Sequence, residues 1–260
     1  MINIGLASHN LKQQVPNDVP LHGQIIPNSH LKSQTFIDKI NQWTKNQEMI
    51  ISGKKTKAMI FNFTNKYQFQ TRLKLDNDNI ETVSSIKILG TIITNTLSWN
   101  ENCSMIIKKV NARMQLLRKV WSFGSNMEEM VNLWKTYCLS ILDQSCAVWS
   151  NGLTAENEQD LERTQKTFCK LVLGEKYISY FEALTTLNLE TLKMRRKKLT
   201  LRFVKQSLAD GKLRDLFPKR LKEHTMRTRR NEKYKVFKAH TDRYKNSPIV
   251  TMQRLLNEAN

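Results

Sequence analysis

The sequence predicts an α+β fold that is mostly helical: a small antiparallel sheet with one helix, followed by a three-helix bundle and further basic helices. Three observations support this prediction. Apolar and polar residues alternate in short runs between about 58 and 93, which is typical of strands. From Ser98 onward the apolar residues recur with the 3.6-residue period of a helix. Basic residues then accumulate toward the C-terminus.

The first third of the chain contains the expected sheet. Residues 1–30 hold three prolines among mixed polar residues, and we expect an extended lead-in there. One helix is expected from 32 to 51, because Gly53 lies just past its end. Strands are expected in the stretches 58–63, 69–75 and 80–93. The Asp-Asn-Asp-Asn run at 76–79 is expected to form the turn between the last two strands. The region that contains the sheet is expected to cover 31–97.

Two S-x-x-E segments mark expected helix starts. They begin at Ser98 and Ser125, and this pattern is typical of a capping box, in which Ser and Glu satisfy each other's backbone amides. The first box predicts a helix that ends near 123. The second predicts one long helix that ends near 149.

A third helix completes the expected bundle, which covers 98–175. Thr154 is expected to cap this helix at its start, and Gly174 to end it. A basic helical region, 176–217, follows the bundle. Beyond it, the basic segment 218–260 has few large aliphatic residues, so we expect a partly disordered tail with a short final helix near 250–258.

The charge of the chain is concentrated in its last 70 residues. The net charge is +19, of which residues 1–190 contribute +4 and residues 191–260, with 21 basic and 6 acidic residues, contribute +15. Such an excess indicates a polyanionic partner. The expected phosphate contacts form a cluster without interleaved aromatic residues: Arg195, Arg196, Lys197, Lys198 and Arg202. A solvated helix face or a nuclear-localisation run is the alternative interpretation of this cluster.

Cysteine usage and hydropathy bound the class of protein. The four cysteines have long, irregular spacings and no C-x-x-C pair, so we expect reduced, buried thiols and no metal site. An intracellular protein, nuclear or cytoplasmic, is expected. No apolar run approaches the roughly 20 residues that span a bilayer, so a membrane is not an expected partner. A small-molecule substrate is not expected either.

Two lysine-containing motifs point to a family. A helix-to-strand turn has the sequence Gly53-Lys54-Lys55-Thr56-Lys57, and an apolar strand further on contains Lys87-Ile88-Leu89-Gly90. This order resembles the end of the palm of jockey-like, non-LTR retrotransposon reverse transcriptases. Weaker similarities follow, as in Leu161–Lys166, so the resemblance runs from about 31 to 218. The helical bundle would then be the polymerase thumb.

The resemblance implies roles for individual residues. Lys54, Lys55 and Lys57 would lie on the pyrophosphate side of a bound nucleotide, where cations stabilise the charge that develops in phosphoryl transfer. Lys87, Leu89 and Gly90 would form the primer grip. The lysine turn on its own is also consistent with a solvated helix end, where cations complement the helix dipole.

The family's catalytic centre is missing from this sequence. RNA-directed DNA polymerases hold Mg²⁺ between paired aspartates, and this chain has no Asp-Asp pair. We therefore expect a truncated piece of such a polymerase, inactive alone, without Mg²⁺ ligands or a cofactor of its own. Its expected partner is RNA or DNA. The alternatives are a non-enzymatic nucleic-acid-binding protein derived from such an element, or a helical protein that binds another protein through its Met-rich helices.

Overall fold

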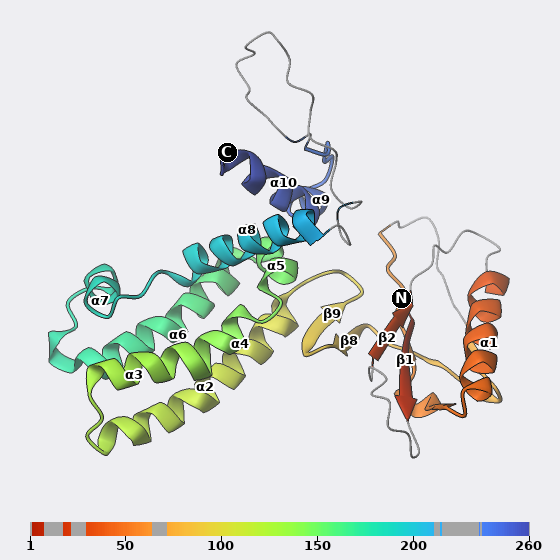
Figure 1. Ribbon diagram of the computed structural model, residues 1–260, viewed down its shortest axis with the longest axis horizontal. Helices are drawn as coiled ribbons and strands as arrows, with labels where there is room; N and C mark the ends of the chain where they lie inside the picture. The colour runs from red at the N-terminus through yellow and green to blue at the C-terminus, as the bar shows by residue number, and fades with distance from the viewer. Residues whose placement is uncertain are drawn as a thin grey trace, which may run out of the picture. The chain divides into compact units, whose positions relative to one another are not determined.

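The computed structural model describes residues 2–7, 18–21, 30–63, 72–210, 214, 234 and 236–259 of the 260-residue chain. Helices predominate among them, and the strands are short and lie in the first part of the chain (Figure 1). This confirms the predicted α+β, mostly α fold class. The chain divides into two compact units, Met1–Ser98 and Trp99–Asn260. We call them the sheet unit and the helical unit.

The main sheet of the sheet unit is built from five short strands. They are β1 (Ile2–Ala7), β2 (Asp18–Leu21), β3 (Ile50–Ile51), β4 (Lys57–Ala58) and β7 (Glu81–Thr82). Their order is β2-β1-β4-β7, and β3 pairs with the far end of β1. The β4–β7 pair is parallel, so the sheet is not wholly antiparallel as expected. Strands β1 and β2 lie in the segment that was expected to be an extended lead-in, and both belong to this sheet.

The α-helix that the structure describes in this unit, α1 (His30–Asn46), packs on the sheet unit's core. Ile37 of α1 is buried and belongs to one apolar cluster with Ile51, Leu75 and Ile80. The helix ends five residues earlier than expected, because Glu48 adopts a left-handed backbone angle (φ 56°) that helical residues do not have. The chain can then enter β3 directly.

Two hairpins complete the sheet unit. In the first, β5 (Lys74–Leu75) and β6 (Asp78–Asn79) are joined by a turn at residues 76–77, so only the first half of the run that was expected to turn does so. In the second, β8 (Ser85–Ile88) pairs with β9 (Thr91–Thr94). The expectation of one continuous strand from 80 to 93 was therefore wrong. Leu89 (φ 47°) and Gly90 (φ 85°) are both left-handed, the geometry of a two-residue hairpin turn, and they reverse the chain.

The helical unit contains the remaining helices. Its α-helices are α2 (Asn100–Ser122), α3 (Met127–Leu133), α4 (Ser140–Asp143), α5 (Cys146–Trp149), α6 (Ala155–Leu173), α7 (Tyr180–Thr186), α8 (Leu192–Asp210), α9 (Asp242–Lys245) and α10 (Pro248–Glu258). A π-helical segment, η2 (Trp134–Leu139), lies between α3 and α4. The second bundle helix is thus not the continuous helix expected up to 149. The π-helix interrupts it, and Ser145 (φ 52°) breaks it before α5.

Helix caps agree with the sequence only in part. Ser98 forms no capping box, because α2 begins at Asn100 with Trp99 in the capping position and no side-chain cap bond. The second box is shifted by one residue: Asn126 Oδ1 accepts from Glu129 N at 2.9 Å, and Glu129 Oε2 accepts from Asn126 N at 3.1 Å. At α6 both predicted ends are confirmed. Thr154 Oγ1 accepts from a backbone N–H, and Gly174 ends the helix with φ 52°.

The core of the helical unit lies between α2, the α3–η2–α4 segment and α6. Trp134 and Phe168 are both fully buried, and their rings stack with centroids 4.6 Å apart. On the other side of α6, α8 buries Val204 against Met252 and Leu256 of α10. Helix α10 matches the short final helix expected near 250–258. Within the expected partly disordered tail, 218–260, residues 218–233 lie outside the described residues, whereas α9 and α10 are helical.

Candidate nucleic-acid interface

The basic helix α8 is fixed at its start by two side-chain caps. Thr191 Oγ1 accepts from Met194 N at 3.2 Å, and Glu162 of α6 accepts from Lys193 N at 2.8 Å. These bonds satisfy two of the N–H groups that a helix start leaves without partners. The carboxylate also complements the positive end of the helix dipole. The first turn of α8 is thus anchored on α6.

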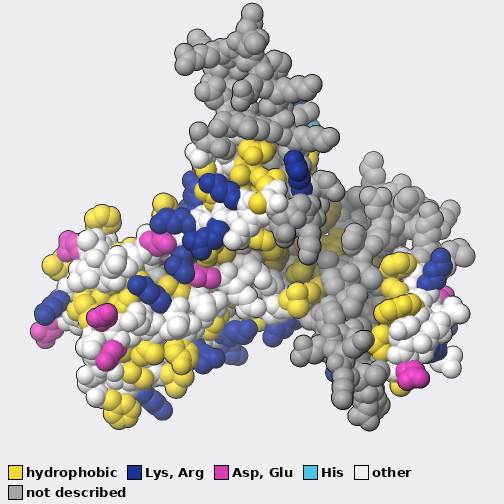
Figure 2. Space-filling model, in the orientation of Figure 1, with side chains coloured by type: hydrophobic (Ala, Val, Ile, Leu, Met, Phe, Trp, Pro, Cys, Tyr) yellow, Lys and Arg dark blue, Asp and Glu magenta, His cyan; other side chains and the backbone are white. Residues whose placement is uncertain are grey.

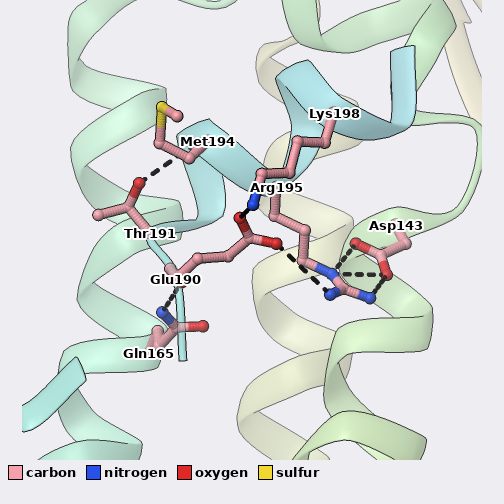
Figure 3. Close-up of polar contacts among 7 residues, drawn as sticks. All are labelled: Asp143, Gln165, Glu190, Thr191, Met194, Arg195 and Lys198. Atoms are coloured by element: carbon pink, nitrogen blue, oxygen red, sulfur yellow. Dashed lines mark hydrogen bonds and ion pairs between the residues drawn. The ribbon is translucent and has the colours of Figure 1, made fainter. Parts of the chain in front are cut away.

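Arg195 joins α8 to α4. Its Nε donates to Asp143 Oδ1 at 2.9 Å and its Nη2 to Asp143 Oδ2 at 2.7 Å, which is the two-pronged geometry of an arginine–carboxylate pair (Figure 3). The bond to Asp143 raises the pKa of Arg195. Glu190, 4.0 Å from Nη1, adds a weaker contact and also pairs with Lys198 at 2.5 Å. The first role of Arg195 is therefore to hold helices together.

Arg196 lies in the interior. It is 4% exposed, and within the described part of the chain its Nη1 and Nη2 make no hydrogen bond. Burial lowers the pKa of Arg196, while the carboxylates of Glu162 and Glu158 act in the opposite direction. A guanidinium in this position cannot reach a phosphate in solvent. Its assignment to the phosphate-contacting cluster was wrong, because a run of basic residues on a helix covers its inner face as well as its outer one.

The other basic residues of α8 differ in their partners. Lys197 pairs with Glu258 of α10 at 2.7 Å, and Lys193 with Glu158 of α6 at 2.9 Å. Arg202 and Lys205 are exposed, and the described residues offer them no ion pair. With Lys198 they are spaced i, i+4 and i+7, so they lie along one face of α8. We call Lys198, Arg202 and Lys205 the basic stripe; Figure 2 shows Lys and Arg side chains gathered over this helix.

The lysine turn of the sheet unit lies at the surface. Lys54 and Lys55 belong to a short 3-10 helix, η1 (Gly53–Lys55), and both are exposed. Lys57 begins β4 and is ion-paired with Glu81 of the neighbouring strand. The buried Thr56 between them donates its hydroxyl to Ser52 O at 2.9 Å. Lys54 and Lys55 are therefore exposed with no ion pair among the described residues, whereas Lys57 is paired.

The residues expected to form the primer grip belong to the second hairpin. Lys87 is an exposed residue of β8, and Leu89 and Gly90 form the turn itself. Leu89 is 71% exposed. These residues lie on the β8–β9 sheet, whereas Lys57 lies on the main sheet. The structure thus brings each motif together internally but places the two motifs on separate sheets.

Within the described ranges no three His, Cys, Asp or Glu residues are grouped closely enough to hold a metal ion. Asp76, one of the few acidic residues in the sheet unit, accepts from Lys45 Nζ and Asn41 Nδ2, each at 2.7 Å. These bonds, that from Lys45 foremost, lower the pKa of Asp76. Among the described residues, the acidic side chains thus form no cluster of the kind that holds Mg²⁺. In the same part of the chain, no helix combines the length and the apolar character needed to cross a bilayer.

The cysteines take no part in the interface. All four are buried and free, as their spacing predicted. Burial raises the pKa of Cys103, Cys146 and Cys169 to about 11 and that of Cys138 to about 12. Because the thiolate is the reactive form, these thiols are inert near neutral pH.

A hollow that no sequence pattern indicates lies beside α8. It measures about 340 Å³, and its wall includes Lys135, Gln165, Glu190, Arg195 and Lys198. These residues come from the π-helix, α6, the loop before α8, and α8 itself. We call it the η2–α8 pocket. A π-helix leaves no periodic pattern in the sequence. The acid that lies closest in space to Arg195, Asp143, is 52 positions away along the chain.

Comparisons with known proteins found no counterpart: no family model, no curated protein and no solved structure matches this chain.

Proposed function

We propose that this chain binds RNA or DNA through phosphate contacts, without sequence preference and without catalysis of its own. The observation that carries the proposal is the basic stripe. Arg202 and Lys205 are exposed cations on an anchored helix, and no acidic partner among the described residues neutralises them. Cations at such a position gain most from phosphates, because each contact releases condensed counterions from the nucleic acid.

The contrast within α8 supports this assignment. Lys193 and Lys197 are matched with acids of α6 and α10, and Arg195 with an acid of α4. Part of the positive charge of α8 is therefore used in ion pairs with neighbouring helices. The charge that is left over lies on one face, and the chain continues from it into a segment with many more basic residues. An extended positive surface of this kind suits a nucleic-acid backbone.

Descent from a non-LTR reverse transcriptase is part of the proposal. It is supported by the order of the lysine turn, the Lys-x-Leu-Gly motif and the segments after them. A polymerase fragment and a non-enzymatic protein derived from such an element have the same binding chemistry. The absence of an Asp-Asp pair favours binding over catalysis in both cases.

The protein-binding alternative rests on the Met-rich helices, where Met127 is partly exposed. Met114 and Met130 of these helices, by contrast, are buried in the core of the helical unit. They fill the bundle, which is the commoner use of methionine in a helix.

The test compares two double variants of the full chain. Arg202→Ala/Lys205→Ala removes two unpaired cations, and Lys193→Ala/Lys197→Ala removes two paired ones from the same helix. Both change the net charge equally. Binding is measured by fluorescence anisotropy with labelled RNA and DNA strands of about 30 nucleotides. The affinity of the first variant should be about five- to tenfold lower than that of the parent chain, and the affinity of the second should fall less than about twofold. Equal losses in both variants, or no binding by the parent chain, would contradict the proposal.

A further inference from the structure

The η2–α8 pocket has an irregular backbone on two sides. Lys135 and Leu139 come from the π-helix, a segment that is rare in proteins and frequent at functional sites. Asn188, which also lines the pocket, adopts a left-handed angle (φ 48°), which Asn tolerates better than most residues. Both irregular segments line the same hollow of about 340 Å³. Its volume is in the range of small-molecule sites.

The base of the pocket is rigid. Gln165 is 1% exposed, and its Nε2 donates to Glu190 O at 2.8 Å and to Tyr180 Oη at 3.0 Å. Tyr180 in turn donates to Glu162 at 2.6 Å. Burial raises the pKa of Tyr180, and the bond to Glu162 adds to the effect, so the hydroxyl stays protonated. This chain of bonds holds the loop before α8, whose Glu190 lines the pocket. Figure 3 shows the contact between Gln165 and Glu190.

The charges around the pocket favour an anion. Three cations line it, Lys135, Arg195 and Lys198, against the one carboxylate of Glu190. Arg195 is held by Asp143 and Lys198 pairs with Glu190, whereas the described residues record no ion pair for Lys135. A phosphate monoester carries more negative charge than Glu190 and offers three oxygens, so it can replace Glu190 at Lys198 and accept from Lys135.

An apolar surface continues from these lysines. A second hollow, of about 370 Å³, shares Lys135 and Asn188 with the first and is also lined by Val131 and Leu187. Leu139 and Leu189 line the first hollow. A flat ring attached to the phosphate could pack on these side chains, because bases stack on or pack against apolar groups without needing a sequence code.

We infer that the η2–α8 pocket binds one nucleotide, with its phosphate at Lys135 and Lys198 and its base on the leucine-lined side. This inference rests on the proposed function and deepens it. The nucleotide is either the phosphorylated end of a bound strand or a free mononucleotide. Both present the same phosphate monoester and base.

The test titrates adenosine monophosphate into the full chain by calorimetry. Lys135→Ala and Lys198→Ala should each weaken binding by at least fivefold. Lys119→Ala, an exposed lysine of α2 outside the pocket, is the matched control and should stay within twofold. Adenosine and inorganic phosphate should each bind more weakly than the nucleotide. Circular dichroism checks that each variant keeps its helices.

A second arm uses strands with a 5′-phosphate or a 5′-hydroxyl. A preference of at least fivefold for the phosphorylated strand, lost in Lys135→Ala, identifies the strand end as the occupant. If the two strands bind with equal affinity and adenosine monophosphate still binds, the occupant is the free mononucleotide. Absence of nucleotide binding, or binding that Lys135→Ala leaves unchanged, overturns the inference while strand binding through the basic stripe can still stand. Failure of the parent chain to bind any strand overturns the proposed function instead.

Discussion

Trp134 gives the most direct test of the packing of the helical unit. Its side chain is fully buried and stacks on Phe168 with an interplanar angle of 13°. A buried tryptophan removes about 150–250 Å² from water. At about 25 cal/mol per Å² this is worth about 4–6 kcal/mol. Since alanine retains part of that area, Trp134→Ala loses less than the whole amount.

One feature of the site offsets this loss. Within the described residues Trp134 Nε1 has no hydrogen-bond partner, so truncation also removes a buried polar group whose desolvation costs about 1–3 kcal/mol. The net expectation for Trp134→Ala is a loss of about 3–5 kcal/mol, as for other large-to-small core changes. For a protein of this size that corresponds to a decrease of roughly 6–20 °C in Tm.

Two control variants make the result specific. Trp134→Phe keeps a ring against Phe168 and removes the unpaired N–H, so it should cost less than about 1.5 kcal/mol. Phe123→Ala, at a side chain that is 87% exposed, should change the free energy of unfolding by less than about 0.5 kcal/mol. Urea unfolding followed by circular dichroism at 222 nm measures all three. If Trp134→Ala melts within a degree or two of the parent, the register of the bundle described above is wrong.

Five further outcomes are expected. Asp143→Ala should cost about 1–3 kcal/mol of unfolding free energy, because Arg195 loses a two-pronged partner, whereas Glu258→Ala at an exposed pair should cost at most about 1 kcal/mol. Leu89→Asn should stabilise the second hairpin by some tenths of a kcal/mol in a denaturant titration, since Asn-Gly suits its turn; a loss would contradict the turn geometry. At pH 8 a thiol reagent should modify the native protein hardly at all and all four cysteines after unfolding. Their raised pKa values also predict that stability falls as the pH rises from about 9 through 11, because the unfolded thiols ionise first. Primer extension with Mg²⁺ on an RNA template should not exceed that of a heat-inactivated sample.

The sequence predicted the parts of the fold that depend on local patterns. Apolar periodicity identified the fold class, and Thr154 and Gly174 marked both ends of α6, because caps are local interactions. Local patterns were insufficient where two adjacent residues could fill the same role. Asn126 and Ser125 are both good capping residues, and the structure uses Asn126. Leu89 gave no turn signal, since leucine rarely takes a left-handed angle, yet it does so here beside Gly90.

The candidate site was less predictable than the fold. A basic run identified α8, but it could not separate buried Arg196 from exposed Arg202, because the helix's inner face depends on which helices pack on it. Asp143, the partner of Arg195, comes from a distant helix. The structure also changes the choice of experiment. Deleting residues 191–260 would remove the buried Leu192 and Val204 along with the charge, so point substitutions on the surface of α8 are the sound probe.

The salt dependence of binding tests the central proposal most directly. Affinity of the full chain for duplex DNA, plotted as log affinity against log salt concentration, should fall with a slope of about −5 if about six phosphates are neutralised, and less steeply on single strands. In Arg202→Ala/Lys205→Ala the slope should become shallower by about 2, since two phosphate contacts are lost. In Lys193→Ala/Lys197→Ala the slope should stay close to that of the parent. A salt-independent affinity, or the same slope in the parent and the Arg202/Lys205 variant, would contradict phosphate binding by the basic stripe.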